Sequence, residues 1–405
     1  MATLAPPRQA GRVQGITLLL PSGLSIMAIV VLVPSLPLLF AHFKGLPGAE
    51  YRVPILLTAP AACLVFASPL AGWLSDRIGR RKLLLVAMAI YAVVGSLPLI
   101  LDDYWAILAS RIALGVVEAA VLTVSTTLIG DFFSGAERAR WLSYQIGVAS
   151  IFATTLIWAG GALSAFGWRG PFAIYVLALP MLAAVALLTW EPQRESGDRA
   201  APTTEVAADD QFPWHSMAGF VVLTLFASIL FYFVLVQLPL MLAAMGMAPS
   251  GTSGFWLSVV SLGVTLGTLA FNRLARLSRP RCLALALAIM GASFAAMSLA
   301  TSVGALLAAA TINQIGAGIL MPTLLTWSTQ RLPHRFRGRG TGIWQGSFSL
   351  GQFLMPILVV VIAGVSGGLG GALRWFAVAA FVAALGAVLV ARAGAGATRS
   401  QGMPA

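Results

Sequence analysis

The feature that most constrains this chain is a series of long apolar runs that repeats along its whole length. A helix needs about 20 mostly apolar residues to cross a hydrocarbon core of about 30 Å, and these runs are that long. They are continuous rather than alternating, which excludes a membrane β-barrel. We count twelve runs, near residues 15–40, 53–71, 83–101, 105–130, 141–165, 168–190, 217–242, 253–275, 281–300, 304–330, 339–363 and 370–392. The sequence predicts an all-α membrane protein with twelve transmembrane helices.

Composition excludes several other classes of protein. Only 9% of the residues are charged, against about 25% in soluble domains. The net charge of +12 does not indicate nucleic-acid binding, because the basic residues lie in short loops between apolar runs. Cys63 and Cys282 lack metal-ligand spacing, so we expect no metal site and no disulfide. We find no P-loop and no catalytic set of side chains, and we therefore expect neither an enzyme nor a cofactor.

One polar stretch divides the chain into two halves. Glu191 to Ser216 is acidic and rich in proline, which is typical of a solvated linker. The halves resemble each other weakly, since ERARWLSYQ and RFRGRGTGIWQ each lead into the fifth run of a half. Two related bundles with the substrate path between them is the parallel-repeat plan of many secondary transporters. The expected parts are a tail (1–14), a six-helix bundle (15–190), a linker (191–216), a second six-helix bundle (217–392) and a tail (393–405).

The basic residues indicate how the chain lies in the membrane. With a cytoplasmic N-terminus, 20 of the 25 Lys and Arg residues fall in inner loops and tails. Outer loops then hold only Lys44, Arg52, Arg169 and Arg374, and Arg111 lies within a run. The positive-inside rule therefore predicts that both termini and the linker are cytoplasmic. We expect a multi-pass protein of the inner (plasma) membrane.

The stretch GWLSDRIGRRK, Gly72 to Lys82, gathers five charges between two apolar runs. Gly72 lets helices approach closely, and Gly79 allows the backbone to reverse. The basic side chains are suited to the anionic headgroups of the inner leaflet. On this evidence alone, the stretch could be a basic turn that only sets the orientation of the chain in the membrane. Asp76, an acid among bases, calls for a specific partner such as a helix N-terminus or an arginine.

This stretch resembles the signature of the major facilitator superfamily, G-x-L-a-D-r-x-G-r-k. The matching residues are Gly72, Leu74, Asp76, Arg77, Gly79, Arg80 and Arg81. The resemblance covers essentially the whole chain and implies two six-helix bundles that rock about a central site. It implies that Asp76 latches onto the N-terminus of span 11, and that Arg80 pairs with an acid at the cytoplasmic end of span 4, where this chain has Asp131.

Further patterns resemble the same family. Arg111 and Gly115 match its span-4 pattern R-x-x-q-G, with Leu114 in place of the usual Gln. Of the span-5 antiporter pattern, Gly147, Gly160 and Gly161 remain and the proline is missing. The double proline of VPSLPLLF in span 1 is similar to drug- and metabolite-efflux members.

Two charged residues, Arg111 and Glu118, lie inside one apolar run. Glu118 is the one acid that we place in the bilayer, and no acid follows Asp210. Ionisable groups are costly there and are functional by default. Seven residues, or about 10 Å, separate the two, which places them on one helical face. We expect Glu118 to exchange a proton with help from Arg111; alternatively, both side chains only satisfy polar partners, or Arg111 binds an anionic substrate.

Several polar and aromatic residues of the second half are candidates for the substrate cavity. For each of them, helix–helix hydrogen bonding or anchoring at the lipid interface is an equally good interpretation. The candidates are Tyr232 and Gln237 in span 7, Asn313 and Gln314 in span 10, and Trp344 and Gln345 in span 11.

The leading hypothesis is a proton-coupled secondary transporter that exports a small, largely hydrophobic organic compound by alternating access. The alternative is proton-coupled uptake of a small organic anion that Arg111 binds. A third hypothesis is a non-transporting sensor or assembly protein built on a transporter scaffold. The expected partners are the substrate, protons and the lipid bilayer, and we expect a monomer. The sequence leaves open the substrate, the direction of transport and the coupling stoichiometry.

Overall fold

The computed structural model describes residues 10–192, 214–274, 277–330 and 337–400, and within these ranges it is helical with no strand. The predicted all-α fold is confirmed. The described residues contain twelve helices that are long and apolar enough to cross a membrane. The elements of the first half are α1 (Arg12–Val30), η1 (Val33–Ser35), α2 (Leu36–His42), α3 (Ala49–Ile78), α4 (Arg80–Ser96), η2 (Leu97–Leu99), α5 (Tyr104–Phe132), α6 (Gly135–Leu163), η3 (Ser164–Phe166), η4 (Gly170–Leu177) and α7 (Ala178–Leu188). Those of the second half are α8 (Trp214–Ala244), α9 (Gly251–Leu274), α10 (Arg279–Ser298), α11 (Val303–Gln330), α12 (Arg337–Ser366) and α13 (Leu369–Ser400).

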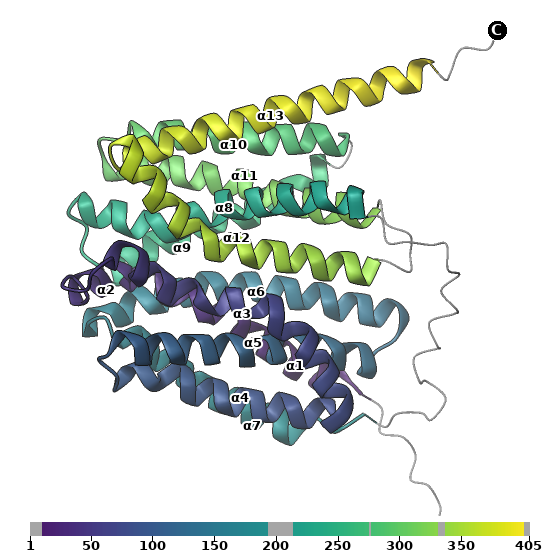
Figure 1. Ribbon diagram of the computed structural model, residues 1–405. Helices are drawn as coiled ribbons and strands as arrows, with labels where there is room; N and C mark the ends of the chain where they lie inside the picture. The colour runs from purple at the N-terminus through teal and green to yellow at the C-terminus, as the bar shows by residue number, and fades with distance from the viewer. Residues whose placement is uncertain (1–9, 193–213, 275–276, 331–336, 401–405) are drawn as a thin grey trace, which may run out of the picture.

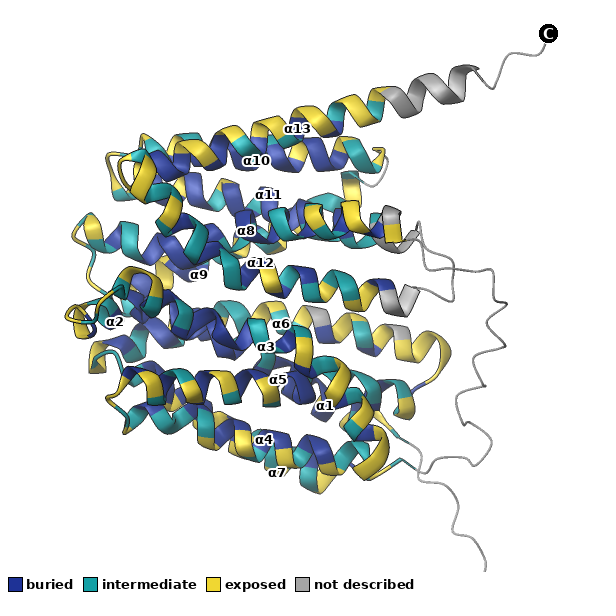
Figure 2. Cartoon of the chain, in the orientation of Figure 1, coloured by how far each residue is buried: buried dark blue, intermediate teal, exposed yellow. Residues whose placement is uncertain are grey.

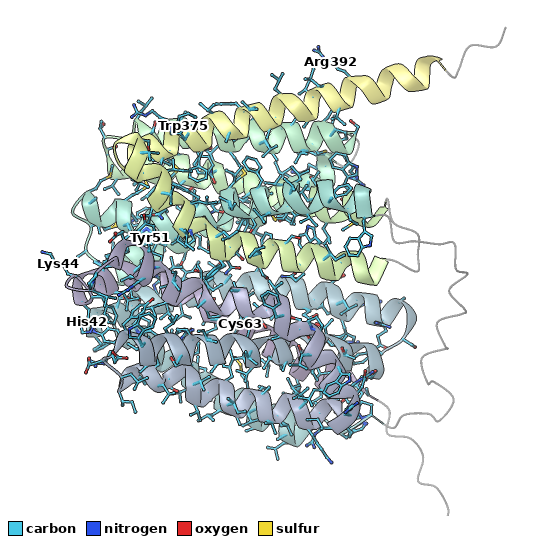
Figure 3. The ribbon with its side chains drawn as sticks, viewed as in Figure 1. His42, Lys44, Tyr51, Cys63, Trp375 and Arg392 are labelled. Atoms are coloured by element: carbon cyan, nitrogen blue, oxygen red, sulfur yellow. The ribbon has the colours of Figure 1, made fainter. Side chains whose placement is uncertain are left out.

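The helices form two bundles that lie side by side, α1–α7 in one and α8–α13 in the other (Figure 1). At one end of the molecule the described chain stops at Pro192 and resumes at Trp214, and we call this the linker end. The opposite, distal end carries α2. Lys44 and His42 lie at the distal end and Arg392 toward the linker end (Figure 3).

Burial follows the interior of each bundle and the seam between the bundles, while the outer faces of helices such as α13 are largely exposed (Figure 2). These exposed faces carry large apolar side chains, for example Phe66 at 81%, Trp375 at 61% and Val365 at 83% exposure. A soluble protein rarely leaves so much apolar surface open, whereas hydrocarbon covers it at no cost.

The first membrane segment, predicted as one run, is broken at its distal end. α1 ends at Val30, a short 3₁₀ turn holds Pro34, and α2 begins at Leu36 with Pro37 at its second position. Proline lacks the backbone N–H that would bond to the preceding turn, and its ring clashes with the carbonyl four residues earlier. The VPSLP sequence therefore allows α2 to change direction relative to α1.

Small residues allow equivalent helices to pack closely in both bundles. A Cβ added at Gly115 of α5 would lie 2.5 Å from the backbone of Pro60 in α3. In the second bundle, a Cβ added at Gly267 of α9 would lie 2.9 Å from the Cα of Gly318 in α11. The second and fourth spans of each half thus share the same close packing, as expected of small residues at helix interfaces.

The two bundles meet along two seams and at the distal end. α3 packs against α12 and α6 against α9, so each half contributes its second and fifth spans. At the distal end, η1 and α2 contact α8. This arrangement leaves the middle of the interface for a cavity.

Candidate functional site

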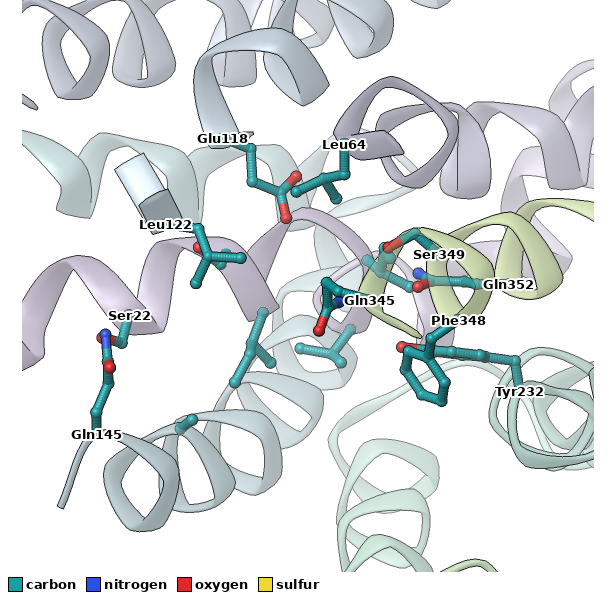
Figure 4. A pocket seen from close by; sticks show the side chains of 15 residues that line it. Ser22, Leu64, Glu118, Leu122, Gln145, Tyr232, Gln345, Phe348, Ser349 and Gln352 are labelled. Carbon is teal, nitrogen blue, oxygen red and sulfur yellow. The ribbon is translucent and has the colours of Figure 1, made fainter. Parts of the chain in front are cut away.

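A cavity of about 310 Å³ lies between the two bundles (Figure 4). The first bundle contributes helices α1, α3, α5 and α6, and the second contributes α8 and α12. The lining residues are Ser22, Ser25, Ile26, Ile29, Val30, Leu64, Glu118, Leu122, Gln145, Ala149, Tyr232, Gln345, Phe348, Ser349 and Gln352. Its wall is mostly apolar with a few convergent polar groups, as is usual for sites that bind small molecules.

Glu118 is the only carboxyl group among these lining residues. It lies near the middle of α5, is 2% exposed, and its Oε2 has no hydrogen-bond partner among the described residues. Figure 4 shows its side chain pointing from α5 toward the cavity, close to Leu64. A buried carboxyl group without a fixed partner can bind and release a proton as its surroundings change.

Gln145 of α6 supplies a hydrogen-bonded polar group to the cavity wall. Its Nε2 donates hydrogen bonds to Ser22 Oγ at 2.8 Å and to Thr126 Oγ1 at 3.2 Å, which ties α6 to α1 and α5. Ser25, one turn along α1 from Ser22, also lines the cavity, and its hydroxyl has no described partner. Sequence reasoning missed these residues, because small polar side chains within apolar helices carry no signal of which face they occupy.

The second bundle supplies an aromatic wall. Tyr232 of α8 and Phe348 of α12 lie with ring centroids 5.4 Å apart, and both line the cavity. Trp344 stacks on Phe348, with ring centroids 5.6 Å apart and an interplanar angle of 12°, but it is not among the lining residues. Gln345 and Gln352 add neutral polar groups from α12.

Three of the cavity candidates, Gln237, Asn313 and Gln314, are not among the lining residues. All three are buried within the second bundle, where Asn313 Nδ2 donates to the carbonyl of Met290 at 3.3 Å. With Trp344, four of the six predicted cavity residues therefore lie outside the wall of the cavity. These helices are apolar all round, so no hydrophobic periodicity indicates which face turns inward.

Arg111 does not lie in the cavity wall and forms no ion pair with Glu118. It is fully buried, and its Nη2 donates to Tyr175 Oη at 2.8 Å and to the carbonyl of Ala28 at 3.2 Å. Its guanidinium also lies over the ring of Tyr175, 5.0 Å from the centroid, and over that of Phe172, at 5.6 Å. Two helical turns separate it from Glu118, too far for a direct bond. The side chain thus joins α5 to α1 and η4.

The turn between α3 and α4 is tighter than the sequence suggests. α3 continues to Ile78 and α4 begins at Arg80, so Asp76 and Arg77 are helical and only Gly79 breaks the helix. Gly79 has φ +101°, a conformation that favours glycine. The carboxylate of Glu191, predicted to be part of a solvated linker, accepts hydrogen bonds from the backbone N–H groups of Arg80 and Arg81, at 2.6 and 3.1 Å. A negative charge at a helix N-terminus is favourable, and Glu191 thereby caps α4.

The motif residues contact one another and α5. Arg80 Nη1 bonds to Asp131 Oδ1 at the end of α5, and Arg80 Nη2 lies 3.5 Å from Asp76. Arg77 lies over the ring of Trp73, 3.9 Å from its centroid. A Cβ added at Gly72 would lie 4.0 Å from Thr123 of α5. The latch predicted between Asp76 and the N-terminus of span 11, the start of α12, stays a prediction; residues 331–336, which precede α12, lie outside the described residues.

The fold and the cavity define a class of protein, a two-bundle membrane carrier. The Major Facilitator Superfamily profile matches residues 18–275 and 220–396, and the chain belongs to this family. Among solved structures, the D-xylose-proton symporter is similar, with a TM-score of 0.77 and 16% identity, covering 92% of this chain and 96% of that one.

Curated relatives match over shorter segments. Protein spinster homolog 3 of Danio rerio is 30% identical over 92 residues, which cover 22% of this chain and 18% of that protein. The Bacillibactin exporter of Bacillus subtilis is 30% identical over 113 residues, 27% of each chain. These alignments span well under a third of either relative.

Proposed function

We propose that this protein is a proton-coupled antiporter that exports a small, largely hydrophobic organic compound. Glu118 carries the proposal, because it is the one carboxyl group among the described residues that line the cavity and is almost completely buried. Its protonated form is compatible with an apolar substrate beside it. Its charged form attracts water or a proton from whichever side the cavity faces.

The cavity wall supports an apolar or weakly polar substrate. Phe348, Tyr232, Leu64 and the α1 residues Ile26 and Ile29 provide apolar and aromatic surface. Hydroxyl and amide groups such as those of Gln345 and Ser349 can fix its orientation without a charge. The name of the relative Bacillibactin exporter supports export, and that of the D-xylose-proton symporter supports proton coupling within this fold.

The alternative, uptake of an organic anion, requires a cation in the cavity. Arg111 is fully buried against Tyr175 and Ala28 and is not among the lining residues. This placement favours export of a neutral or largely apolar compound. A Glu118 carboxylate would also repel an anion in the same cavity.

The basic residues support a location in the inner (plasma) membrane, with the linker end in the cytoplasm. Arg80, Arg81 and Lys82 lie on the first turn of α4, whose N-terminus is at that end. We further propose that the Asp76–Arg80–Asp131 contacts hold the cytoplasmic gate during turnover, and that the protein works as a monomer.

Proteoliposomes test the coupling. In wild-type vesicles, an imposed pH gradient should drive a fluorescent apolar substrate across the membrane in the direction opposite to proton flow. The same gradient should fail to drive the substrate in Glu118→Gln vesicles. Accumulation in the same direction as proton entry would instead identify a symporter and contradict the proposed direction.

A further inference from the structure

Three amide side chains line the central cavity, those of Gln145, Gln345 and Gln352. The Nε2 of Gln145 already donates to Ser22 and Thr126. Gln345 is exposed, so water can reach its amide. Gln352 differs from both, because it is 4% exposed and its Nε2 has no hydrogen-bond partner among the described residues.

The side chain of Gln352 belongs to the face of α12 that lines the cavity. Gln345, Ser349 and Gln352 follow one another at intervals of four and three residues, which places them on one side of the helix. All three are lining residues. Figure 4 shows the amide of Gln352 pointing from α12 into the cavity, beside Ser349.

Close packing against α8 fixes this turn of α12. Ser228 Oγ of α8 donates to the carbonyl of Phe348 at 2.6 Å. A Cβ added at Gly351, the residue before Gln352, would lie 2.7 Å from the carbonyl oxygen of Leu225 in α8. The backbone beside Gln352 therefore has little room to turn, and its amide is held toward the cavity.

The amide nitrogen of Gln352 can donate a hydrogen bond but cannot accept one. A buried donor without an acceptor costs free energy, and a bound molecule that brings an acceptor removes that cost. Water can supply the acceptor when no ligand is bound. A ligand that displaces this water and has no acceptor leaves the donor unpaired. The Gln352 amide can therefore discriminate between ligands of the same shape.

The neighbouring groups define the rest of the ligand. Tyr232 and Phe348, with ring centroids 5.4 Å apart, offer aromatic surface. The hydroxyl of Ser25 also has no described partner, but it can donate or accept and so selects less strongly. Glu118, the one acid among these lining residues, is assigned to the proton. A neutral molecule with aromatic rings and an acceptor oxygen matches this set of groups.

We propose that Gln352 is a specificity-determining residue of the cavity, and that it selects neutral aromatic compounds that carry a hydrogen-bond acceptor such as a ketone oxygen. The oxygen accepts from Gln352 Nε2 while the rings lie against Tyr232 and Phe348. This inference rests on the proposed function and narrows the proposed hydrophobic substrates to one chemical class.

Equilibrium binding to the full-length protein in lipid nanodiscs tests the proposal. The probes are tritiated benzophenone and tritiated diphenylmethane, which share two phenyl rings and differ in the carbonyl group. Empty nanodiscs give the amount of each probe that partitions into lipid. We call the ratio of the two dissociation constants the ketone preference. Wild-type protein should bind benzophenone about tenfold more tightly than diphenylmethane.

The Gln352→Met substitution keeps a side chain of similar length and removes the donor. It should weaken the binding of benzophenone and make the two affinities roughly equal. The matched control is Gln314→Met. Gln314 is also buried and its Oε1 has no described partner, but it does not line the cavity, so this variant should keep the ketone preference.

Equal wild-type affinity for the two probes would overturn the inference, and this comparison needs no substitution. A ketone preference that Gln352→Met leaves intact would overturn the assignment to Gln352. Loss of the preference in Gln314→Met as well would overturn it too, because the effect would then come from the second bundle in general. Thermal unfolding shows whether both variants are folded.

Binding is measured without a pH gradient, which separates this inference from the coupling. If the ketone preference is found and flux through Glu118→Gln protein still follows the gradient, the proposed coupling fails and the role of Gln352 stands. If flux is coupled through Glu118 and the preference is absent, the inference about Gln352 alone fails.

Discussion

The carboxylate of Glu191 accepts a hydrogen bond of 2.6 Å from the backbone N–H of Arg80, 111 residues earlier in the chain. The last residues of the first bundle thereby cap the helix that follows the signature turn. Without the carboxylate, the first N–H groups of α4 lose their acceptor. We expect Glu191→Ala to lower the free energy of unfolding by about 1 kcal/mol, and Glu191→Gln, which keeps an acceptor, to lower it less. Chemical denaturation in detergent measures both. Equal stability of wild type and Glu191→Ala would show that the cap is unimportant.

Gly79 should tolerate no side chain. Its φ is +101°, and an added Cβ would lie 3.1 Å from Glu191 Oε1. Gly79→Ala strains the backbone and pushes the capping carboxylate away, at a cost of about 1–3 kcal/mol. The matched control is Gly386→Ala in α13, where the new methyl group meets nothing and alanine favours the helix. Thermal unfolding should show a lower midpoint for Gly79→Ala alone.

Arg80 and Asp131 should act as a coupled pair. Their side chains are 24% and 20% exposed, and Asp76 lies 3.5 Å from the same guanidinium. We expect Arg80→Gln to impair transport more than Asp131→Asn, because it removes both contacts. The double variant should transport no more slowly than Arg80→Gln. The double-mutant cycle should give a coupling energy of about 1 kcal/mol between the two side chains. Additive losses in initial transport rate would mean that the two residues act independently.

Tyr175 should matter for stability rather than for substrate binding. Its hydroxyl accepts from Arg111 and lies 3.1 Å from the carbonyl of Ala28. Tyr175→Phe leaves a buried cation with one acceptor fewer, at a cost of about 1–3 kcal/mol. The substrate KM should not change, because Tyr175 does not line the cavity. Tyr144→Phe on the exposed side of α6 is the control, and a raised KM for Tyr175→Phe with unchanged stability would contradict this role.

The membrane topology could be predicted from sequence because each span has its own local signal. Length and apolarity mark a helix without knowledge of its neighbours, and all twelve predicted spans coincide with described helices. The residues at which the helices end were less predictable. Asp76 and Arg77 are charged, yet α3 continues through them, because a helix end at a membrane surface is marked by Gly79 and not by the first charge.

The residues of the cavity were predictable only in part, since Glu118, Tyr232 and Gln345 are the predicted candidates that line it. Glu118 was identified from its charge, and it lines the cavity. Ser22 and Gln145, which share a hydrogen bond, are 123 residues apart in sequence and were not predicted. Gln237 and Asn313 look equally polar in the sequence and lie inside the second bundle. Which polar group faces the cavity depends on how the helices pack, and apolar helices give no periodic sign of it.

The most direct test of the central role of Glu118 is substrate flux in proteoliposomes measured across a series of imposed pH gradients. Glu137→Gln, which removes an exposed carboxylate from the first turn of α6, is the matched control. Wild-type and Glu137→Gln fluxes should rise with the gradient. The Glu118→Gln flux should be independent of the gradient, while substrate exchange at equal pH persists. A Glu118→Gln flux that rises with the gradient as the wild type does would contradict proton coupling through this residue.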